Sequence, residues 1–450
     1  MNTTELFIQS LWTVRDMELT PELIHAVKRC LLDYLGVTLA GSRLQGERGK
    51  VLLEALGPGI GECSVIGYAR MSTLHSASFI NGLSSHVAEL DDGVISGIIH
   101  PGAPVFTALL AVAEKESVGF DNFCRGVLIG YESSVRLANA IQPSHKKRGY
   151  HASGTCGLIG ATLGIAAMLG YTPKQVHDSF CAAVASVHGT LKVLEDDSEL
   201  KPFNIATAAS DGIVAALMGQ AGFEGPADPL EGQAGFFAQF SEETDYSKLY
   251  RSEGESLHIF DVYVKPYAAC RYVHPSIENA LKLRLNHGID VSQVVSIEIR
   301  TYALAVRNHD HTTVNNVSSA KMSIPFGAAV ALITGSGGMG AFGEGMVRDA
   351  DVSSLMKKIS VVEDEECSLH FPAKSMAYMT VKMQDGTQYA SLTEHPRGEA
   401  SMPLSDTELI DKFKELCAFG DLSMEDTEHV VDNLFSADVN LHNILKIMRT

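Results

Sequence analysis

The chain has 450 residues, of which 45% are hydrophobic and 20% are charged, a composition typical of a globular protein and not of a disordered one. Its length predicts two domains. The formal net charge of −19 argues against a nucleic-acid partner, because phosphate contacts need a clustered basic face and only Lys146, Lys147 and Arg148 stand together. The apolar runs are far shorter than a membrane span, so we expect no membrane partner.

The start of the chain and its cysteines indicate the compartment. Residues 1–9 lack the basic opening and the long apolar run of a signal peptide. The eight cysteines are scattered and form no C-x-x-C pair, which favours reduced thiols. We therefore expect a cytoplasmic protein. Cys156 lies in a glycine-rich stretch and is the thiol to examine first for reactivity.

The first half of the chain, from Glu5 to about Phe240, has a helical pattern. Thr20-Pro21 and Thr172-Pro173 each supply an N-cap and a proline suited to the first turn. Residues 160–170 and 206–218 are rich in alanine and glycine on nearly all sides. Helices of that composition are buried on most faces. We therefore predict a helical core that contains inner helices.

The pattern changes near Lys265, where short alternating segments appear. A helix is expected over residues 320–333, and helices return after Pro403. The expected strands are 295–302, 359–362, and a hairpin of 378–382 with 387–392.

These patterns predict a mainly α fold. We expect a large all-helical domain that is discontinuous, formed by residues 1–264 and 400–450. The remaining residues, 265–399, are expected to form a smaller α+β lid domain with an antiparallel sheet.

The segment from Glu89 to Gly102 concentrates charge between two apolar stretches. It contains Glu89, Asp91, Asp92 and His100, which are costly to bury unless they are paired or used. A metal site drawn from these four residues is not favoured, because the ligand mixture is not diagnostic and no second histidine stands three or four positions away. Acid–base chemistry is the better interpretation, since histidine titrates near neutrality and a nearby carboxylate orients it.

A glycine-rich stretch, Gly335–Gly340, formally matches the dinucleotide motif G-x-G-x-x-G. The motif requires a strand before it and a helix after it. An alanine-rich helical pattern precedes this stretch and no helix start follows, so we interpret it as a loop.

Three expected helix starts carry His100, His151 and Lys201. The free N–H groups of helix starts attract anions, histidine is the usual proton shuttle, and lysine suits a carboxylate or a proton relay. Each residue alone is more often structural. Together, in otherwise apolar surroundings, they favour a site for a small anionic substrate.

A fourth polar segment lies where the two domains are expected to meet. It contains Lys265, Arg271 and His274, which can close over the carboxylates of a ligand. The alternative interpretation is a cationic hinge on the surface.

Taken in order, these segments resemble the MmgE/PrpD family over nearly the whole chain. The family includes 2-methylcitrate dehydratase, cis-aconitate decarboxylase and iminodisuccinate epimerase. The resemblance implies a large, discontinuous all-helical domain with a smaller α+β lid domain, homodimers and no required cofactor. It is carried by L-D-D-G…H-P-G (90–102), R-G-Y-H-A-S-G-T-C-G (148–157), K-P-F-N-I-A-T-A-A (201–209), V-K-P-Y-A-A-C-R-Y-V-H-P (264–275), S-I-P-F (323–326) and F-P-A-K (371–374).

The resemblance also implies roles for single residues. His100, His151 and Lys201 match the family's active-site histidines and lysine. Glu89 stands where the decarboxylase-like members have Asp, Gly93 where they have Thr, and Phe326 where they have Tyr. The two missing hydroxyls argue against a cis-aconitate decarboxylase, because losing a hydrogen-bond donor in a site is costly for a specific substrate.

The family chemistry is the removal or return of a proton on a carbon next to a carboxylate. We expect a cofactor-independent lyase or isomerase that acts on a small di- or tricarboxylate, first of all by dehydrating a 2-methylcitrate-like hydroxy acid. His100 and His151 are the acid–base candidates, Lys201 binds or relays a proton, and Glu89 and Asp92 orient a histidine or share in proton transfer. Substrate carboxylates are expected to meet Lys265, Arg271 and His274, near Gly93 and Phe326.

Three alternatives stay open on the sequence alone. The first is an epimerase of an iminodisuccinate-like substrate, and the second is a cis-aconitate-type decarboxylase. The third is a carboxylate-binding family member without activity, an alternative suggested by the missing hydroxyls at Gly93 and Phe326. Dehydration, epimerisation and decarboxylation differ in which group, if any, leaves the substrate. That outcome depends on side-chain placement of about an ångström.

Overall fold

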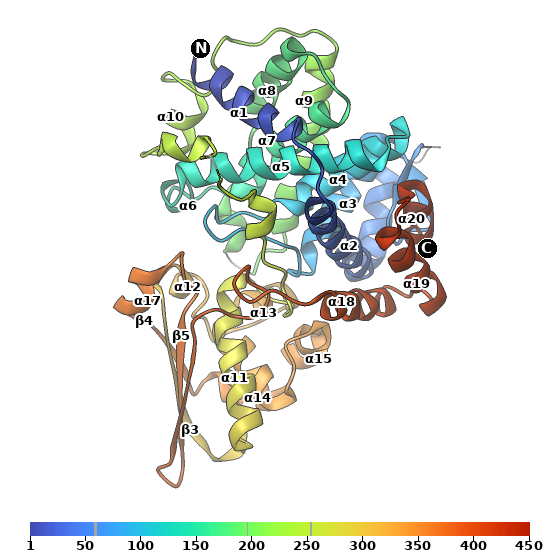
Figure 1. Cartoon of the computed structure of the whole chain (residues 1–450). Coiled ribbons are helices and arrows are strands. Elements are labelled where there is room, and N and C mark those ends of the chain that lie inside the picture. Colours follow the sequence, from blue (N-terminus) through green and yellow to red (C-terminus); the bar gives the residue numbers. More distant parts are fainter. Residues whose placement is uncertain (58–60, 196, 253) are drawn as a thin grey trace.

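The computed structural model describes residues 1–57, 61–195, 197–252 and 254–450. The chain forms a helical domain and a smaller lid of helices and strands, which lie one above the other in Figure 1. The prediction of a mainly α fold is confirmed.

The first part of the chain forms most of the helical domain. Thr20 and Thr172 cap α2 and α8 as predicted, and each helix has a proline in its first turn. The helices are α1 (Thr3–Arg15), α2 (Pro21–Leu56), α3 (Leu74–Val87), α4 (Gly102–Glu116), α5 (Phe120–Ile141), α6 (Ser144–Lys147), α7 (Ala152–Met168), α8 (Pro173–Ser186), α9 (Lys201–Gln220) and α10 (Phe236–Phe240).

The prediction of inner helices is confirmed by α7, all of whose residues are buried. Glycines allow α7 to lie directly against α5. A methyl group added to Gly160 would lie 2.6 Å from the carbonyl oxygen of Gly130, and one added to Gly164 would lie 2.8 Å from that of Gly126. Larger side chains at these positions would push the two backbones apart, so the small residues set the interhelical distance.

The lid combines helices with a four-stranded sheet of order β4-β3-β5-β6. Its elements are α11 (His274–His287), β3 (Val294–Thr301), α12 (Ala303–Val306), α13 (Val317–Met322), α14 (Ile324–Thr334), α15 (Glu344–Val347), α16 (Ala350–Met356), β4 (Ile359–Glu363), α17 (Glu365–His370), β5 (Ala377–Met383) and β6 (Gln388–Thr393).

Three local predictions are corrected by the structure. The sheet is mixed, because β4 runs parallel to β3 while β5 and β6 are antiparallel neighbours. The single helix expected over residues 320–333 is two helices, since Ser323 is extended and caps α14 ahead of Pro325. The helical domain also contains a short antiparallel pair, β1 (Cys63–Val65) with β2 (Arg70–Ser72).

The end of the chain returns to the helical domain as α18 (Asp406–Phe419), α19 (Met424–Phe435) and α20 (Leu441–Met448) (Figure 1). Ser405 caps α18, which confirms the return to helices after Pro403. Lys412 of α18 forms a 2.5 Å ion pair with buried Asp33 of α2, and Phe413 packs where Gly36 has no side chain. Both ends of the chain therefore contribute to the helical domain.

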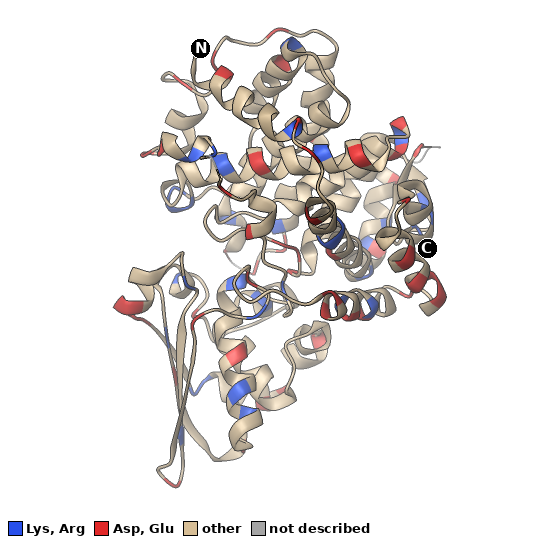
Figure 2. Ribbon diagram, viewed as in Figure 1, with Lys and Arg blue, Asp and Glu red and all other residues tan. Residues whose placement is uncertain are grey.

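Charged residues are spread over both domains in Figure 2, with acidic residues prominent on α18 and α19. In the described part of the chain, no helix has the length and apolar character needed to cross a membrane. The glycine-rich stretch 335–340 leaves α14 and continues into a short 3₁₀ turn, so it is a loop, as predicted.

Candidate active site

A pocket lies where the helical domain meets the lid. Four of the residues singled out in the sequence line it: His100, His151, Lys201 and Arg271. The other lining residues are Val94, Ile95, Ile98, Gln142, Lys146, Tyr150, Ala152, Leu191 and Leu194 from the helical domain, with Tyr263, Cys270, Tyr272, Tyr302, His309, Met322, Phe371 and Ser375 from the junction and the lid.

His100 is held just before α4 with one ring nitrogen fixed. Its backbone N–H donates to Ser153 Oγ (2.9 Å), and its Nδ1–H donates to the carbonyl oxygen of Asp92 (2.6 Å). The carboxylate of Asp91 lies 3.3 Å from the same nitrogen. The ring proton is therefore on Nδ1, and Nε2 has a free lone pair.

Burial keeps that imidazole neutral. It lowers the pKa of His100 to about 3, with Lys265 and His86 adding to the effect and Asp91 opposing it. At neutral pH the Nε2 lone pair is therefore available. His100 has the protonation state of a general base.

His151 has its ring proton on the other nitrogen. It is the N-cap residue of α7, and its backbone N–H donates to the carbonyl oxygen of Gly189 (3.1 Å). The side-chain amide of Asn204 donates to its Nδ1 (3.3 Å), which places the ring proton on Nε2. Burial first, and then the charges of His86 and Lys201, lower the pKa of His151 well below its usual range. His151 is thus a neutral N–H donor.

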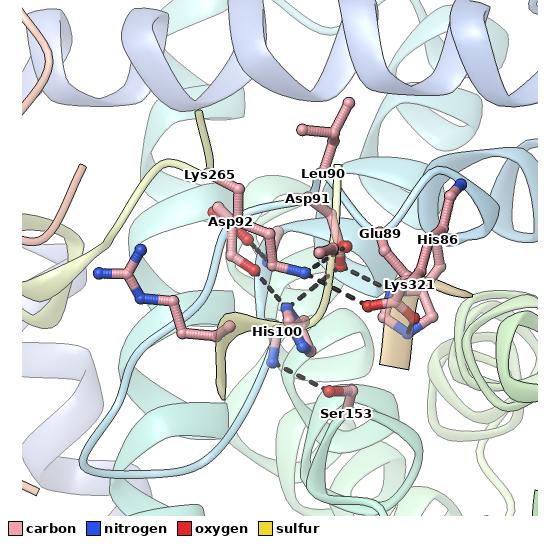
Figure 3. Close-up of polar contacts among 12 residues, drawn as sticks. His86, Glu89, Leu90, Asp91, Asp92, His100, Ser153, Lys265 and Lys321 are labelled. Carbon is pink, nitrogen blue, oxygen red and sulfur yellow. Dashed lines mark hydrogen bonds and ion pairs between the residues drawn. The ribbon is translucent and has the colours of Figure 1, made fainter. Parts of the chain in front are cut away.

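The buried charges behind the histidines are paired (Figure 3). Lys201 Nζ lies 2.5 Å from one carboxylate oxygen of Glu89, and Lys265 Nζ lies 3.4 Å from the other. His86 Nδ1 lies 2.7 Å from Asp91, which Lys265 also approaches at 3.6 Å. This pairing offsets the free-energy cost of burying these charges.

Glu89 reaches Lys201 from an unusual backbone conformation. Its φ is +54°, in the left-handed region that residues other than glycine seldom adopt. Burial alone would raise the pKa of Glu89, but Lys201 and Lys265 outweigh it and hold the pKa well below its usual value. Burial would likewise lower the pKa of Lys201, yet Glu89 and neighbouring anions raise it. Lys201 therefore keeps its charge at the pocket wall.

Asp92 supports the site without facing the pocket. Its carboxylate accepts hydrogen bonds from the Tyr131 hydroxyl (2.5 Å) and from the backbone N–H of Gly102 at the start of α4 (3.0 Å). Burial, together with Asp33 and Asp91, raises the pKa of Asp92 to about 7. The side chain anchors α4, and only the backbone carbonyl of Asp92 touches His100.

Two basic residues expected to bind substrate are turned away from the pocket. Lys265 is completely buried because it neutralises Glu89 and Asp91. His274 is also completely buried, with Nε2 donating to the carbonyl oxygen of Ala269 (3.0 Å) while Arg271 contacts its Nδ1 (3.1 Å). Of the three basic residues in this segment, Arg271 alone lines the pocket.

The positions with missing hydroxyls also lie outside the pocket wall. Phe326 is buried in the lid and packs against Phe342. Gly93 pairs with the backbone of Tyr263, and a methyl group added to Gly93 would lie 2.3 Å from the Tyr263 hydroxyl oxygen. A tyrosine hydroxyl from another segment therefore occupies the space beside Gly93.

The lid side of the pocket was missed by the sequence analysis. Tyr272, Tyr302 and Ser375 line the pocket, and their hydroxyls are buried without a hydrogen-bond partner among the residues the structure describes. Buried donors without a partner are costly, so these three hydroxyls are candidates to pair with a ligand. The sequence held a weak signal only for Tyr272, which lies in the segment 264–275.

The cysteines of the chain differ in their surroundings. Cys156, the thiol to examine first, is buried, and burial raises the pKa of its thiol to about 12, which argues against reactivity. Cys270 is partly exposed and lines the pocket. Across the described ranges, no group of three or more His, Cys, Asp or Glu is placed to hold a metal ion.

Comparisons with known proteins match both parts of the chain. The model of the MmgE/PrpD N-terminal domain matches residues 11–249, and that of the MmgE/PrpD C-terminal domain matches residues 267–434. The cis-aconitate decarboxylase-like protein oryM of Aspergillus oryzae is 24% identical over 93% of this chain and 91% of its own. The cis-aconitate decarboxylases of Aspergillus terreus and Homo sapiens are each 22% identical, over 89% and 91% of this chain and 86% and 87% of theirs.

Proposed function

The chain belongs to the MmgE/PrpD family and is an enzyme of the lyase type, and on this premise we propose that it is a hydro-lyase acting on a small hydroxy di- or tricarboxylate. The proposed substrate resembles 2-methylcitrate. The proposed reaction removes a proton next to a carboxylate and expels the hydroxyl group on the neighbouring carbon as water.

The observation that carries this proposal is the pair of neutral imidazoles with opposite protonation. His100 has a lone pair on Nε2, because Nδ1–H is committed to the Asp92 carbonyl. His151 has its proton on Nε2, because Nδ1 accepts from Asn204. Elimination of water needs one group of each kind: a base for the carbon-bound proton and an acid for the leaving hydroxyl.

The reaction follows from these two groups. His100 Nε2 takes the proton, and the electron pair of the C–H bond moves toward the carboxylate as an enediolate. That pair then forms the double bond as the C–O bond breaks, and His151 Nε2–H protonates the departing hydroxyl to give water. A positioned base of this kind contributes roughly 10²–10⁴-fold to the rate.

Cations at the pocket support an anionic substrate. Lys201 and Arg271 line the wall, and the pKa of Lys201 is raised by Glu89 and its neighbours despite burial. Burial lowers the pKa of Lys146, a third lining residue, to about 8, which leaves it mostly charged at pH 7. Lys201 and Arg271 are ion-paired with Glu89 and Glu399, whereas Lys146 forms no ion pair among the described residues. In a chain of net charge −19, these three cations at the wall favour a carboxylate substrate and stabilise the developing enediolate.

Decarboxylation is the second candidate, favoured by the relatives named cis-aconitate decarboxylase. In that reaction the C–C bond to a carboxylate breaks first, and His151 Nε2–H protonates the carbon that keeps the electron pair. The missing hydroxyls at Gly93 and Phe326 do not argue against this outcome, since neither residue lines the pocket and the Tyr263 hydroxyl lies beside Gly93.

A product screen by NMR in deuterated buffer tests the proposal. Purified enzyme is incubated separately with 2-methylcitrate, citrate, cis-aconitate and iminodisuccinate. Hydro-lyase activity predicts new alkene carbon signals from a hydroxy acid, with no loss of carbon. Loss of CO₂ from cis-aconitate without dehydration of any hydroxy acid would replace this proposal by the second candidate. Inversion of iminodisuccinate alone, or no change in any compound, would contradict both.

We also propose that the enzyme is a cytoplasmic homodimer that requires no metal or other cofactor. The carboxylates nearest the pocket support the last point, because Glu89 and Asp91 are engaged by Lys201 and Lys265 and are not free to ligate. Activity retained after dialysis against a chelator, and a dimer mass from light scattering, are the expected results. Chelator-sensitive activity or a monomer mass would contradict the respective point.

A further inference from the structure

We propose that Cys270 and His309 form a second acid–base pair in the same pocket, on the lid wall, which exchanges a proton with the substrate carbon that His100 deprotonates. This inference rests on the proposed function, because it concerns the same carbon. It adds a proton donor and acceptor from the other domain, so that the enzyme can return a proton to this carbon from the lid side.

The geometry is that of an oriented thiol–imidazole pair. Cys270 Sγ lies 3.6 Å from His309 Nε2, and His309 Nδ1–H donates to the carbonyl oxygen of Arg307 (2.7 Å). That bond directs the unprotonated Nε2 of His309 toward the thiol. The backbone N–H of Cys270 donates to the carbonyl oxygen of Lys321 (2.9 Å), which fixes the cysteine itself. A reactive group, a base and an orienting group are thus arranged in sequence.

The charges around Cys270 come from several elements. His309 is the paired imidazole, Lys201 and Lys146 are the facing cations, and Glu89 is the facing anion. Burial first, and also the charge of Cys270, raise the pKa of Tyr263, Tyr272 and Tyr302. Burial would raise the pKa of Cys270, but His309 and Lys201 outweigh it and lower the pKa to about 6. The thiol and the thiolate are then both accessible near neutral pH.

Another cysteine of this chain shows that proximity to histidine is not sufficient. Cys181 Sγ lies 3.8 Å from His177, but the thiol donates to the carbonyl oxygen of Pro226 (3.2 Å). Burial, followed by Asp178 and Asp228, raises the pKa of Cys181 to about 12. Cys181 does not line the pocket. The same two residue types therefore give an inert thiol in one place and an ionisable thiol in the other.

The surroundings of Cys270 indicate that a ligand meets this wall. The buried hydroxyls of Tyr272 and Tyr302 line the same pocket and have no partner within the described part of the chain. The Tyr272 ring lies edge-on to His309, with centroids 5.2 Å apart. A substrate that satisfies these hydroxyls brings its carbon chain against Cys270.

The proposed step balances as a proton exchange. His100 takes the proton and leaves the enediolate, and Cys270 Sγ–H delivers its proton to the same carbon as the electron pair re-forms a C–H bond. The product of this branch is the epimerised or exchanged acid, with a thiolate at Cys270 and an imidazolium at His100. Proton exchange with water, or the reverse reaction, restores both groups.

Alkylation tests the pair without any substrate. Iodoacetamide labelling, followed by mass spectrometry across pH 5 to 9, should modify Cys270 first, with a rate that levels off above a midpoint near 6. His309→Gln should move the midpoint toward the ordinary thiol value of about 8.5. Cys181→Ser serves as the matched control and should leave the profile unchanged. Preferential labelling of another cysteine, or a rate still rising above pH 8 in the unmodified protein, would overturn the proposal.

Deuterium exchange tests the catalytic role. With an acid that the enzyme turns over in D₂O, Cys270→Ser should lower the rate of deuterium return to the substrate carbon by about 10²-fold. Cys181→Ser should retain the exchange rate, and circular dichroism should show that both variants fold. Exchange by Cys270→Ser within twofold of the unmodified enzyme overturns the inference alone. If the unmodified enzyme exchanges with none of the four acids, the proposed function fails instead.

Discussion

The two walls of the pocket differ in how their polar groups are satisfied. On the helical wall, Lys201 is paired with Glu89, and the ring nitrogens Nδ1 of His100 and His151 are engaged by the protein. On the lid wall, the hydroxyls of Tyr272 and Tyr302 have no partner among the described residues. The groups of the helical wall are therefore preorganised before substrate binds, whereas the hydroxyls of Tyr272 and Tyr302 on the lid wall are left for the substrate to pair with.

This difference suggests a division of labour. Preorganised charges and fixed ring tautomers set the chemistry, because they need no reorganisation during the reaction. Donors without partners set the choice of ligand, because a ligand that fails to pair with them leaves them unsatisfied. Substitutions on the helical wall should therefore act mainly on kcat, and substitutions on the lid hydroxyls mainly on KM.

The largest effect is expected from the histidines of the helical wall. His100→Gln and His151→Gln should each lower kcat by roughly 10²–10⁴-fold, because each removes one of the two proton-transfer groups. Steady-state kinetics on the substrate found by NMR measure this change. His25→Gln, a change at a half-buried position of α2 that pairs with Asp406 and does not line the pocket, is the matched control. Turnover within threefold of the unmodified enzyme in both pocket variants would make the site assignment wrong.

Stability should depend strongly on the paired charges behind that wall. Glu89→Gln leaves Lys201 and Lys265 buried without their shared anion, and breaking such a buried pair costs about 3–5 kcal/mol. Urea unfolding measures the loss. Glu47→Gln, at an exposed ion pair with Lys50, should change the free energy of unfolding by less than about 1 kcal/mol. Equal effects of the two changes would contradict the account of the buried pairs.

Acidification should destabilise the protein through its buried neutral histidines. Burial lowers the pKa of His100 to about 3 and that of His145 to about 4, so below pH 6.5 the unfolded chain binds protons that the folded protein does not. Their contribution is complete above pH 6.5 and is lost as the pH falls toward these values. Each of these two histidines should lower the free energy of unfolding by about 2 kcal/mol as the pH falls from 6.5 to 5.

Two buried carboxyls with a raised pKa, Asp92 and Asp33, oppose this trend. The raised pKa of Asp92, about 7, makes the folded protein bind a proton that the unfolded chain does not. The stability that Asp92 contributes therefore decreases as the pH rises toward 7, and as the pH falls it offsets the loss from about one histidine. Thermal unfolding from pH 7 to 5 should still show a falling melting temperature, since burial also lowers the pKa of His151 and His274. A melting temperature that is constant or rises would contradict the assignment of neutral histidines.

The smallest effect is expected from the lid hydroxyls. Tyr302→Phe and Tyr272→Phe should raise KM about 2- to 10-fold, the equivalent of one hydrogen bond to the substrate, with little change in kcat. Their melting temperatures should be unchanged or higher, because the lost hydroxyls have no partner in the described structure. Tyr131→Phe, which removes a hydrogen bond to Asp92, should instead lower the melting temperature. If Tyr302→Phe lowered the melting temperature as much as Tyr131→Phe does, the Tyr302 hydroxyl would be structural.

The sequence predicted the helical wall well because its signals are local. Thr172-Pro173 marks a helix start within a few residues, and His151 and Lys201 were found because they precede or open helices. The parallel direction of β4 was missed, since an alternating pattern defines a strand but not the direction of its neighbour.

The lid wall was predicted poorly because it is a product of tertiary structure. Cys270 and His309 are separated by 39 positions, and no spacing rule relates them. Tyr302 was assigned only to the end of a strand, and the ionic role of Lys265 depends on its contact with Glu89, 176 positions earlier. Residue type and helix position identified candidate groups, but which of them face the pocket depended on packing between the domains.

Transfer of a proton from carbon to His100 is the central claim, and deuterium exchange measures it most directly. The enzyme is incubated in D₂O with the acid it turns over, and the deuterium at the carbon next to the carboxylate is followed by NMR. The unmodified enzyme and His25→Gln should exchange this position, and His100→Gln should do so at least about 10²-fold more slowly. Exchange by His100→Gln within threefold of the unmodified enzyme would contradict the role of His100 as the base.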